Sequence, residues 1–149
     1  MEDVMTITHI IDLEVKPRCP YGWMIEEHIP GAPNYEWDPT KVALYLDEGQ
    51  KTGVVKGAEL REKLKGQRVF NANLLDSLLS HPELIPDDWK GKKVCFWGTI
   101  YRGSDSYLNV RCLCWFGGRW YSSCRWLFIG FDDGYPALVS ASLPAEASA

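Results

Sequence analysis

Three cysteines in the last third of the chain are the first residues whose chemistry needs an explanation. Cys112 and Cys114 form a C-x-C pattern, and Cys95 lies one predicted strand earlier. A zinc site needs four nitrogen or sulfur ligands in a tetrahedron, usually from C-x2–4-C turns. Two thiols in mid-strand point the same way but are spread along the pleat. We therefore expect reduced thiols that fill a packed sheet, and neither a metal ion nor another cofactor; a metal site and a reactive thiol are the alternatives.

Histidines are the candidates for acid–base chemistry. His28 follows Glu26 and Glu27, and because side chains alternate along a strand, only Glu26 would lie beside His28 as an orienting carboxylate. His81 precedes a proline, which is typical of a helix end. His9 alternates with apolar residues, which favours a hydrogen-bonded core histidine. A charged edge and a helix end explain His28 and His81, so catalysis by either one is an alternative rather than our prediction.

The strongest functional pattern is a set of aromatic side chains interleaved with arginines. Its members are Trp115, Trp120, Tyr121, Trp126, Arg111, Arg119 and Arg125. Trp, Tyr and Arg dominate the energetics of protein interfaces, and stacked rings with arginines also suit single-stranded nucleic acid. The rings belong either to a core or to an exposed recognition surface. Our functional prediction depends on the second arrangement, with at least two of the four aromatic side chains accessible in one contiguous patch.

These side chains are positioned by a predicted three-stranded meander over residues 93–127. Gly117-Gly118 can supply the positive φ angles of a two-residue hairpin turn, and residues 103–106 would close the first hairpin. The expected pairs are Phe116–Arg119, Cys114–Tyr121, Cys112–Ser123, Tyr101–Leu108, Trp97–Cys112 and Cys95–Cys114.

Neither face of this meander is polar. One face would carry Cys95, Trp97, Thr99, Tyr101, Leu108, Val110, Cys112, Cys114, Phe116 and Tyr121. The other would carry Phe96, Ile100, Leu113, Trp115, Trp120, Cys124 and Trp126. A half-solvated antiparallel sheet normally alternates apolar and polar residues. We therefore expect that both faces are covered, that the sheet curls into a partial barrel, or that one face presents its aromatic residues to a partner.

The remaining elements complete an α+β fold with an antiparallel sheet. Leucine spacing predicts short helices at about 57–65 and 73–81, the second capped by Asn71 or Asn73. Alternating apolar residues predict strands at 5–15, 21–29 and 42–46, and a short edge strand at 137–140. An alternative helix start at Asp38-Pro39 is weighed against the strand at 42–46. Residues 1–142 are expected to form one domain and 143–149 a frayed tail.

Composition restricts the class of function. Residues 1–90 carry a net charge of −6 and residues 91–149 a net charge of +2, whereas a nucleic-acid binder usually has a basic domain or stripe. Nucleic acid is therefore a weaker expectation than a protein partner. The sequence contains no apolar run long enough to span a bilayer and no basic leader followed by an apolar run, so we expect no membrane partner. Five cysteines without regular spacing favour the reducing cytoplasm.

Two motifs give the chain a resemblance to a known group of sequences. These are H-P-E-L-I-P-x-x-W-K-G-K, beginning at His81, and F-W-G-T-I-Y-R, beginning at Phe96. The chain resembles a family of small uncharacterised bacterial proteins that share these motifs, and the likeness extends from about Trp23 to Ser142. The resemblance implies no activity, cofactor or catalytic residue. Where relatives tend to have Tyr or Trp in the late strands, this chain has Cys112, Cys114 and Cys124.

We therefore predict a non-enzymatic interaction module that binds a protein partner, or a second copy of itself, through the aromatic and arginine-rich surface of the meander. The first alternative is a binder of single-stranded nucleic acid or of a small ligand that stacks on Trp and Tyr. The second alternative is a small enzyme that uses His81 or His28.

Overall fold

The computed structural model describes residues 9–141 and confirms the α+β class with a largely antiparallel sheet. Met5 and Ile7 of the predicted first strand, and the predicted tail at 143–149, lie outside the described residues. The strands are β1 (Ile10–Ile11), β2 (Met24–His28), β3 (Tyr35–Glu36), β4 (Val42–Tyr45), β5 (Val55–Lys56), β6 (Val94–Arg102), β7 (Leu108–Phe116), β8 (Arg119–Trp126), β9 (Gly130–Phe131) and β10 (Ala137–Ser140). The α-helices are α1 (Glu48–Thr52), α2 (Gly57–Lys63) and α3 (Ala72–Ser80), and the 3-10 turns are η1 (Pro39–Lys41), η2 (Pro82–Leu84) and η3 (Asp87–Trp89).

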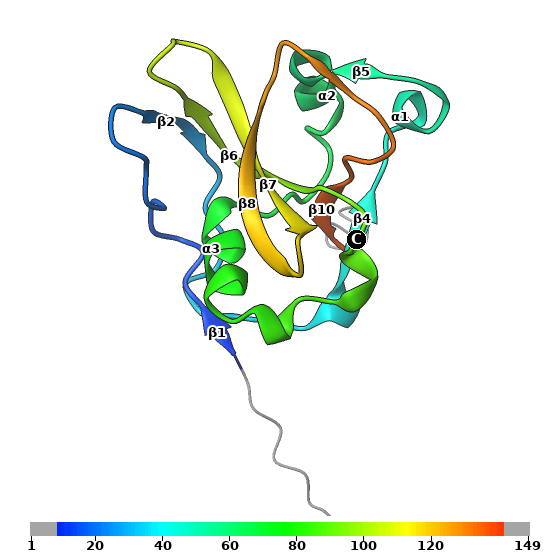
Figure 1. Cartoon of the computed structure of the whole chain (residues 1–149). Coiled ribbons are helices and arrows are strands. Elements are labelled where there is room, and N and C mark those ends of the chain that lie inside the picture. The colour runs from blue at the N-terminus through cyan, green and yellow to red at the C-terminus, as the bar shows by residue number, and fades with distance from the viewer. Residues whose placement is uncertain (1–8, 142–149) are drawn as a thin grey trace, which may run out of the picture.

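The central sheet has the strand order β4-β10-β6-β7-β8, and β2 also pairs with β6 (Figure 1). The predicted edge strand at 137–140 is therefore an interior strand, antiparallel to β4 and parallel to β6. Its residues Ala137, Leu138 and Val139 are all buried, which suits a strand covered on both faces rather than an edge. The sheet stays open, with β4 and β8 at its two ends, so the curled alternative does not extend to a closed barrel.

The hairpin of β7 and β8 has the predicted register, from Phe116 opposite Arg119 to Cys112 opposite Ser123. Gly117 and Gly118 have φ angles of +64° and +83°, as a two-residue turn of this kind requires.

The predicted register of the first hairpin is wrong. Arg102, not Tyr101, is opposite Leu108, because the loop includes Tyr107 and is one residue longer than expected. Cys95 faces Cys112 rather than Cys114, because an irregularity between Cys95 and Ile100 shifts the pairing again.

That irregularity exchanges the faces of the following residues. Ile100 packs with Cys95 and Trp97 instead of with Phe96. Thr99 lies toward α3, where its hydroxyl accepts a hydrogen bond from the Ala72 amide at 3.0 Å. The predicted face lists are therefore correct on β7 and β8, but wrong for Thr99, Tyr101 and Ile100 on β6.

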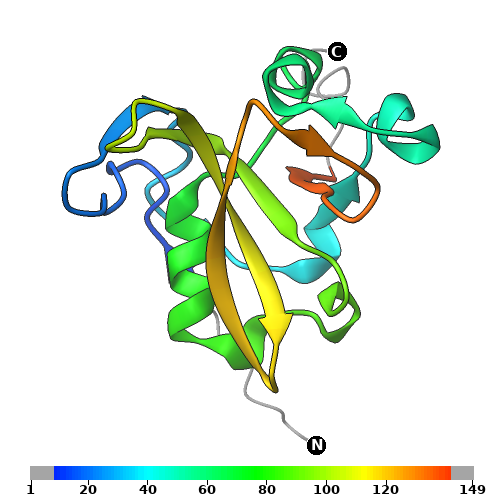
Figure 2. The same ribbon diagram turned by 45° about the horizontal axis from the view of Figure 1, so that its top comes forward.

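Both faces of the sheet are covered, as one of the expected arrangements requires. The helix α3 lies along one face, where Leu74, Leu75 and Leu78 are fully buried against Phe96 and Leu113 (Figure 2). The other face is covered by α2 and the small β5–β9 ribbon, which bury a second cluster around Trp97 and Phe131. A single sheet thus separates two hydrophobic cores.

Both predicted helices form, and their ends differ from the predicted ones by at most two residues: α2 is Gly57–Lys63 and α3 is Ala72–Ser80. Asn71 caps α3, because its side-chain oxygen accepts a hydrogen bond from the Asn73 backbone amide. The side-chain NH₂ group of Asn71 donates to the Leu13 and Ile29 carbonyls, which ties the N-terminal segment to the helix. The two alternatives at residues 38–46 are both present, because η1, capped by Asp38, runs directly into β4.

Several short elements are absent from the sequence prediction or shorter than predicted. The predicted strand at 5–15 pairs only at Ile10 and Ile11 in its described part, because Leu13 then exchanges hydrogen bonds with the irregular segment at 31–32. The helix α1 and the β5–β9 ribbon were not predicted; their lengths of five and two residues are too short for a periodic signal. Among residues 9–141 no helix is long and apolar enough to cross a membrane.

Candidate aromatic interface

The four predicted aromatic residues do not form one contiguous patch. Trp115 and Trp120 are half-buried and in edge contact at 5.3 Å, beside the Gly117-Gly118 turn. Trp126 lies six residues further along β8, about 20 Å in an extended strand. Tyr121 is paired with Cys114 and therefore faces the opposite side of the sheet. Tyr121 and Trp126 are accessible, with exposures of 36% and 43%, but they lie apart.

Two of the three predicted arginines are held inside the molecule. Arg111 bonds the Asp76 carboxylate of α3 at 2.9 Å, and its side chain is only 14% exposed. Although burial alone would lower it, this contact raises the pKa of Arg111, so the guanidinium stays charged. Arg125 donates to the Gly130 carbonyl and the Tyr135 hydroxyl, and it lies over the Tyr135 ring at 4.0 Å. Only Arg119 of the three is exposed.

A different aromatic cluster is exposed at the far end of the β7–β8 hairpin. Its members are Tyr107, Trp126 and Phe128, which are 52%, 43% and 47% exposed. We call it the Tyr107 cluster. Phe128 stacks on Trp126 with an interplanar angle of 17° and lies 4.7 Å from Tyr107, so the three rings form one group.

Sequence reasoning identified only Trp126 of this cluster. The signal for the other two was present: the β7–β8 register places Asn109 opposite Trp126, so Tyr107 and Phe128 each continue that pair by two residues on the same side. The alternation of side chains, continued two residues beyond the last pair, would have predicted the cluster.

Within the residues that the structure describes, His28 has no carboxylate beside it, which the catalytic alternative would require. Glu26 bonds Arg102 at 3.0 Å and Glu27 bonds Arg61 at 2.7 Å, whereas His28 contacts the Thr99 hydroxyl at 3.2 Å. Glu26 is the bulged residue of β2, so the regular alternation that would have placed it beside His28 is interrupted there.

His81 lies elsewhere, at the end of α3 beside His9, whose Nε2 is 2.9 Å from the Ser77 hydroxyl. A serine and a histidine at this distance are the beginning of a nucleophilic site. Ser77, however, lies inside α3, where the neighbouring backbone amides belong to the helix and are not available to bind an oxyanion.

Three cysteines of the meander, Cys95, Cys112 and Cys114, are buried side by side, whereas Cys124 is exposed. The sulfur atoms of Cys95 and Cys112 are 2.8 Å apart, and Cys114 contacts the Ser123 hydroxyl at 3.3 Å. Burial, and then the neighbouring Cys112 thiol, raises the pKa of Cys95 well above its usual range. In the described part of the chain no three side chains of His, Cys, Asp and Glu converge as metal ligands would.

No family model, curated protein or solved structure matches this chain.

Proposed function

We propose that this chain is a non-enzymatic interaction module that binds a protein partner, or a second copy of itself, through the Tyr107 cluster. The observation that carries the proposal is the exposure of three stacked aromatic rings in one group. Large aromatic side chains at an interface supply much contact area at a low cost in conformational entropy. The stacking of Trp126 on Phe128 already restricts both rings, so binding would order them little further.

The edge of the sheet adds a second feature that suits protein binding. Strand β8 is eight residues long and stands at the end of the sheet, with Trp126 as its last residue. An edge strand of this length presents unpaired backbone groups that can pair with a strand of another chain. An aromatic cluster at its end would fix the position of such a partner.

Single-stranded nucleic acid is less well supported. Two of the three arginines that would contact phosphates, Arg111 and Arg125, are engaged at Asp76 and Gly130. The loop between β6 and β7 also carries the exposed acid Asp105, two residues before Tyr107. We place the protein in the cytoplasm, because its five cysteines are all free thiols, which is typical of a reducing compartment.

The test compares two phenylalanines of the same hairpin. Phe128→Ser removes the centre of the Tyr107 cluster, whereas Phe116→Ser removes a still more exposed ring at the other end, next to the Gly117 turn. Sedimentation velocity over a range of concentrations measures self-association, and capture from host extract with mass spectrometry measures partner binding. We expect Phe128→Ser to weaken the observed self-association or partner binding by about tenfold or more, which is the size of a hot-spot loss. Phe116→Ser should bind almost as tightly as the wild type. Equal behaviour of the two variants, or no association and no partner for the wild type, would overturn the proposal.

A further inference from the structure

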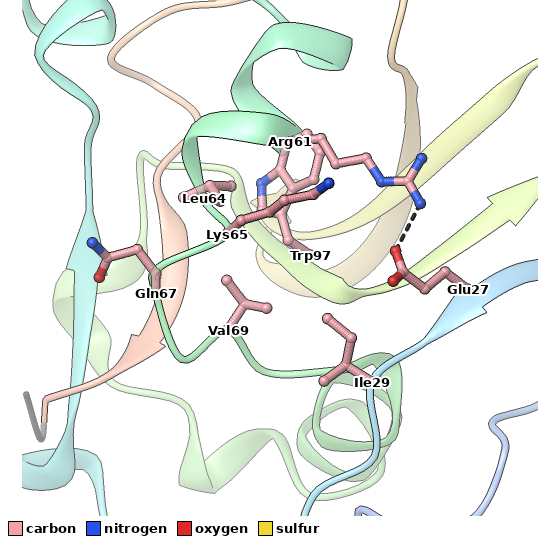
Figure 3. Close-up of a pocket in the computed structure, with 8 residues that line it drawn as sticks. All are labelled: Glu27, Ile29, Arg61, Leu64, Lys65, Gln67, Val69 and Trp97. Atoms are coloured by element: carbon pink, nitrogen blue, oxygen red, sulfur yellow. Dashed lines mark hydrogen bonds and ion pairs between the residues drawn. The ribbon is translucent and has the colours of Figure 1, made fainter. Parts of the chain in front are cut away.

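A pocket of about 350 Å³ lies under α2, on the side of the sheet away from α3 (Figure 3). It is bordered by α2, by the end of β2 and by the segment that follows α2, with Trp97 of β6 behind them. Its volume is within the range of small-molecule sites, which is about 300–1,000 Å³. None of its residues belongs to the Tyr107 cluster, so the two surfaces are separate.

The inner wall of the pocket is apolar and contains one unpaired polar atom. Ile29, Leu64 and Val69 supply aliphatic surface around the Trp97 ring. Trp97 is only 4% exposed, and among the described residues its indole nitrogen has no hydrogen-bond partner. Buried polar groups are nearly always paired, and leaving one unpaired destabilises the fold. An acceptor from outside the chain would remove that cost.

The side chain of Lys65, at the rim of the pocket, can move at little cost. Figure 3 draws the indole nitrogen next to Leu64, with the stem of Lys65 passing in front of the ring. Lys65 is 70% exposed and pairs with Glu62 three residues earlier on the helix. Exposed ion pairs of this kind contribute little to stability, so a ligand can shift the lysine stem and bind its ammonium group.

Two cationic side chains lie at the mouth of the pocket, each in an ion pair: Arg61 with Glu27 and Lys65 with Glu62. Arg61 and Lys65 border it together with a single carboxylate, that of Glu27. The Glu27 oxygen accepts from one Arg61 nitrogen at 2.7 Å, whereas a guanidinium has five N–H donors in a planar fork. The pocket therefore combines an apolar interior with two cations at its entrance, whose ion pairs leave N–H donors available to a ligand.

We propose that this pocket binds a small carboxylate that carries an apolar ring or chain. The carboxylate lies between Arg61 and Lys65, where a charge-assisted hydrogen bond is available. The apolar part lies against Val69 and Trp97. A polar atom of the ligand or a water molecule that it traps accepts the indole N–H.

The experiment uses 4-phenylbutyrate as the probe, titrated into the full chain and followed by the indole ¹⁵N–¹H resonances. The Trp97 signal is assigned from its loss in Trp97→Phe. We expect saturable binding that shifts this signal, and no saturation by the uncharged amide of the same acid. No saturation by 4-phenylbutyrate up to about 10 mM, weaker than the usual range of specific ligands, would overturn the proposal, as would equal binding of the amide.

Two substitutions with opposite expected effects on affinity distinguish binding at this site from a general structural effect. Lys65→Glu reverses a charge at the mouth and should weaken binding about tenfold, whereas Glu27→Gln frees Arg61 and should strengthen it. Lys51→Glu, in the exposed helix α1 and outside the pocket, is the matched control and should leave the affinity unchanged. If Lys65→Glu and Glu27→Gln change the affinity in the same direction, or if Lys51→Glu acts like Lys65→Glu, the site is not the one proposed.

Discussion

At the scale of single residues, burial determines which of the five thiols are available to react. Cys95, Cys112 and Cys114 are buried in the sheet, whereas Cys19 and Cys124 are exposed. A thiol reacts through its thiolate, so both access and pKa matter. Partial burial raises the pKa of Cys19 and of Cys124, which lowers their thiolate fraction at neutral pH without blocking access.

We predict that a water-soluble aromatic disulfide reagent modifies two thiols of the folded chain at pH 7.5 and the other three only after unfolding. The raised pKa values keep most of both exposed thiols protonated at pH 7.5. Because the thiolate fraction increases with pH, the fast phase should accelerate as the pH rises toward 9. Absorbance at the released thiolate's band counts the equivalents. In Cys19→Ser the fast phase should fall by one equivalent; a third fast thiol in the wild type would contradict the burial of the meander cysteines.

At the scale of elements, the bulge in β6 shows what the sequence could and could not predict. The turn at Gly117-Gly118 and the leucine stripe of α3 are local signals, and both predictions were correct. The bulge depends on a contact from outside the strand: the Gly98 amide donates to the Phe70 carbonyl, and the Ile29 amide donates to the Gly98 carbonyl. Gly98 in mid-strand is itself a signal of a bulge or a close backbone approach, which the uniform alternation overlooked. Residues 94–102 do not, however, identify Phe70 and Ile29 as the partners.

The same limit applies to the candidate site. Trp126 was found from its residue type, but the engagement of Arg111 and Arg125 depends on Asp76 and Gly130, whose positions relative to the meander follow only from the tertiary fold. Residue type alone therefore predicted a more basic surface than the molecule has.

Gly98 gives a test of this close approach between β6 and the start of α3. A Cβ atom at Gly98 would lie 2.8 Å from the Asn71 backbone, whereas a Cβ at the exposed Gly66 would meet nothing within 4 Å. We predict that Gly98→Ala lowers the free energy of unfolding by about 1–3 kcal/mol, as overpacking against rigid backbone does. Gly66→Ala should leave it unchanged or raise it slightly. Urea denaturation measures both; a neutral Gly98→Ala would mean that α3 can move away from β6.

At the scale of the whole molecule, β10 joins the two cores. Leu138 and Val139 are adjacent and almost fully buried, and because neighbouring side chains on a strand point to opposite faces, each enters a different core. The strand also pairs with β4 on one side and β6 on the other. The last described strand is therefore required by elements that precede it by about forty to ninety residues in the chain, which makes late, long-range pairing part of folding.

We therefore predict that a chain ended after Gly134, which lacks β10, has no cooperative unfolding transition. Its loss would leave β4 without its partner in the sheet and would expose apolar surface of both cores, including Phe96 on one face and Trp97 on the other. A chain ended after Ala141 keeps every described strand and serves as the control, with a transition close to that of the full chain. Thermal denaturation followed by near-ultraviolet circular dichroism distinguishes the two, because the tryptophans of both cores contribute to the signal. A cooperative transition in the shorter chain would show that β4, β6 and the helices are stable without β10, and that the two cores are not coupled through this strand.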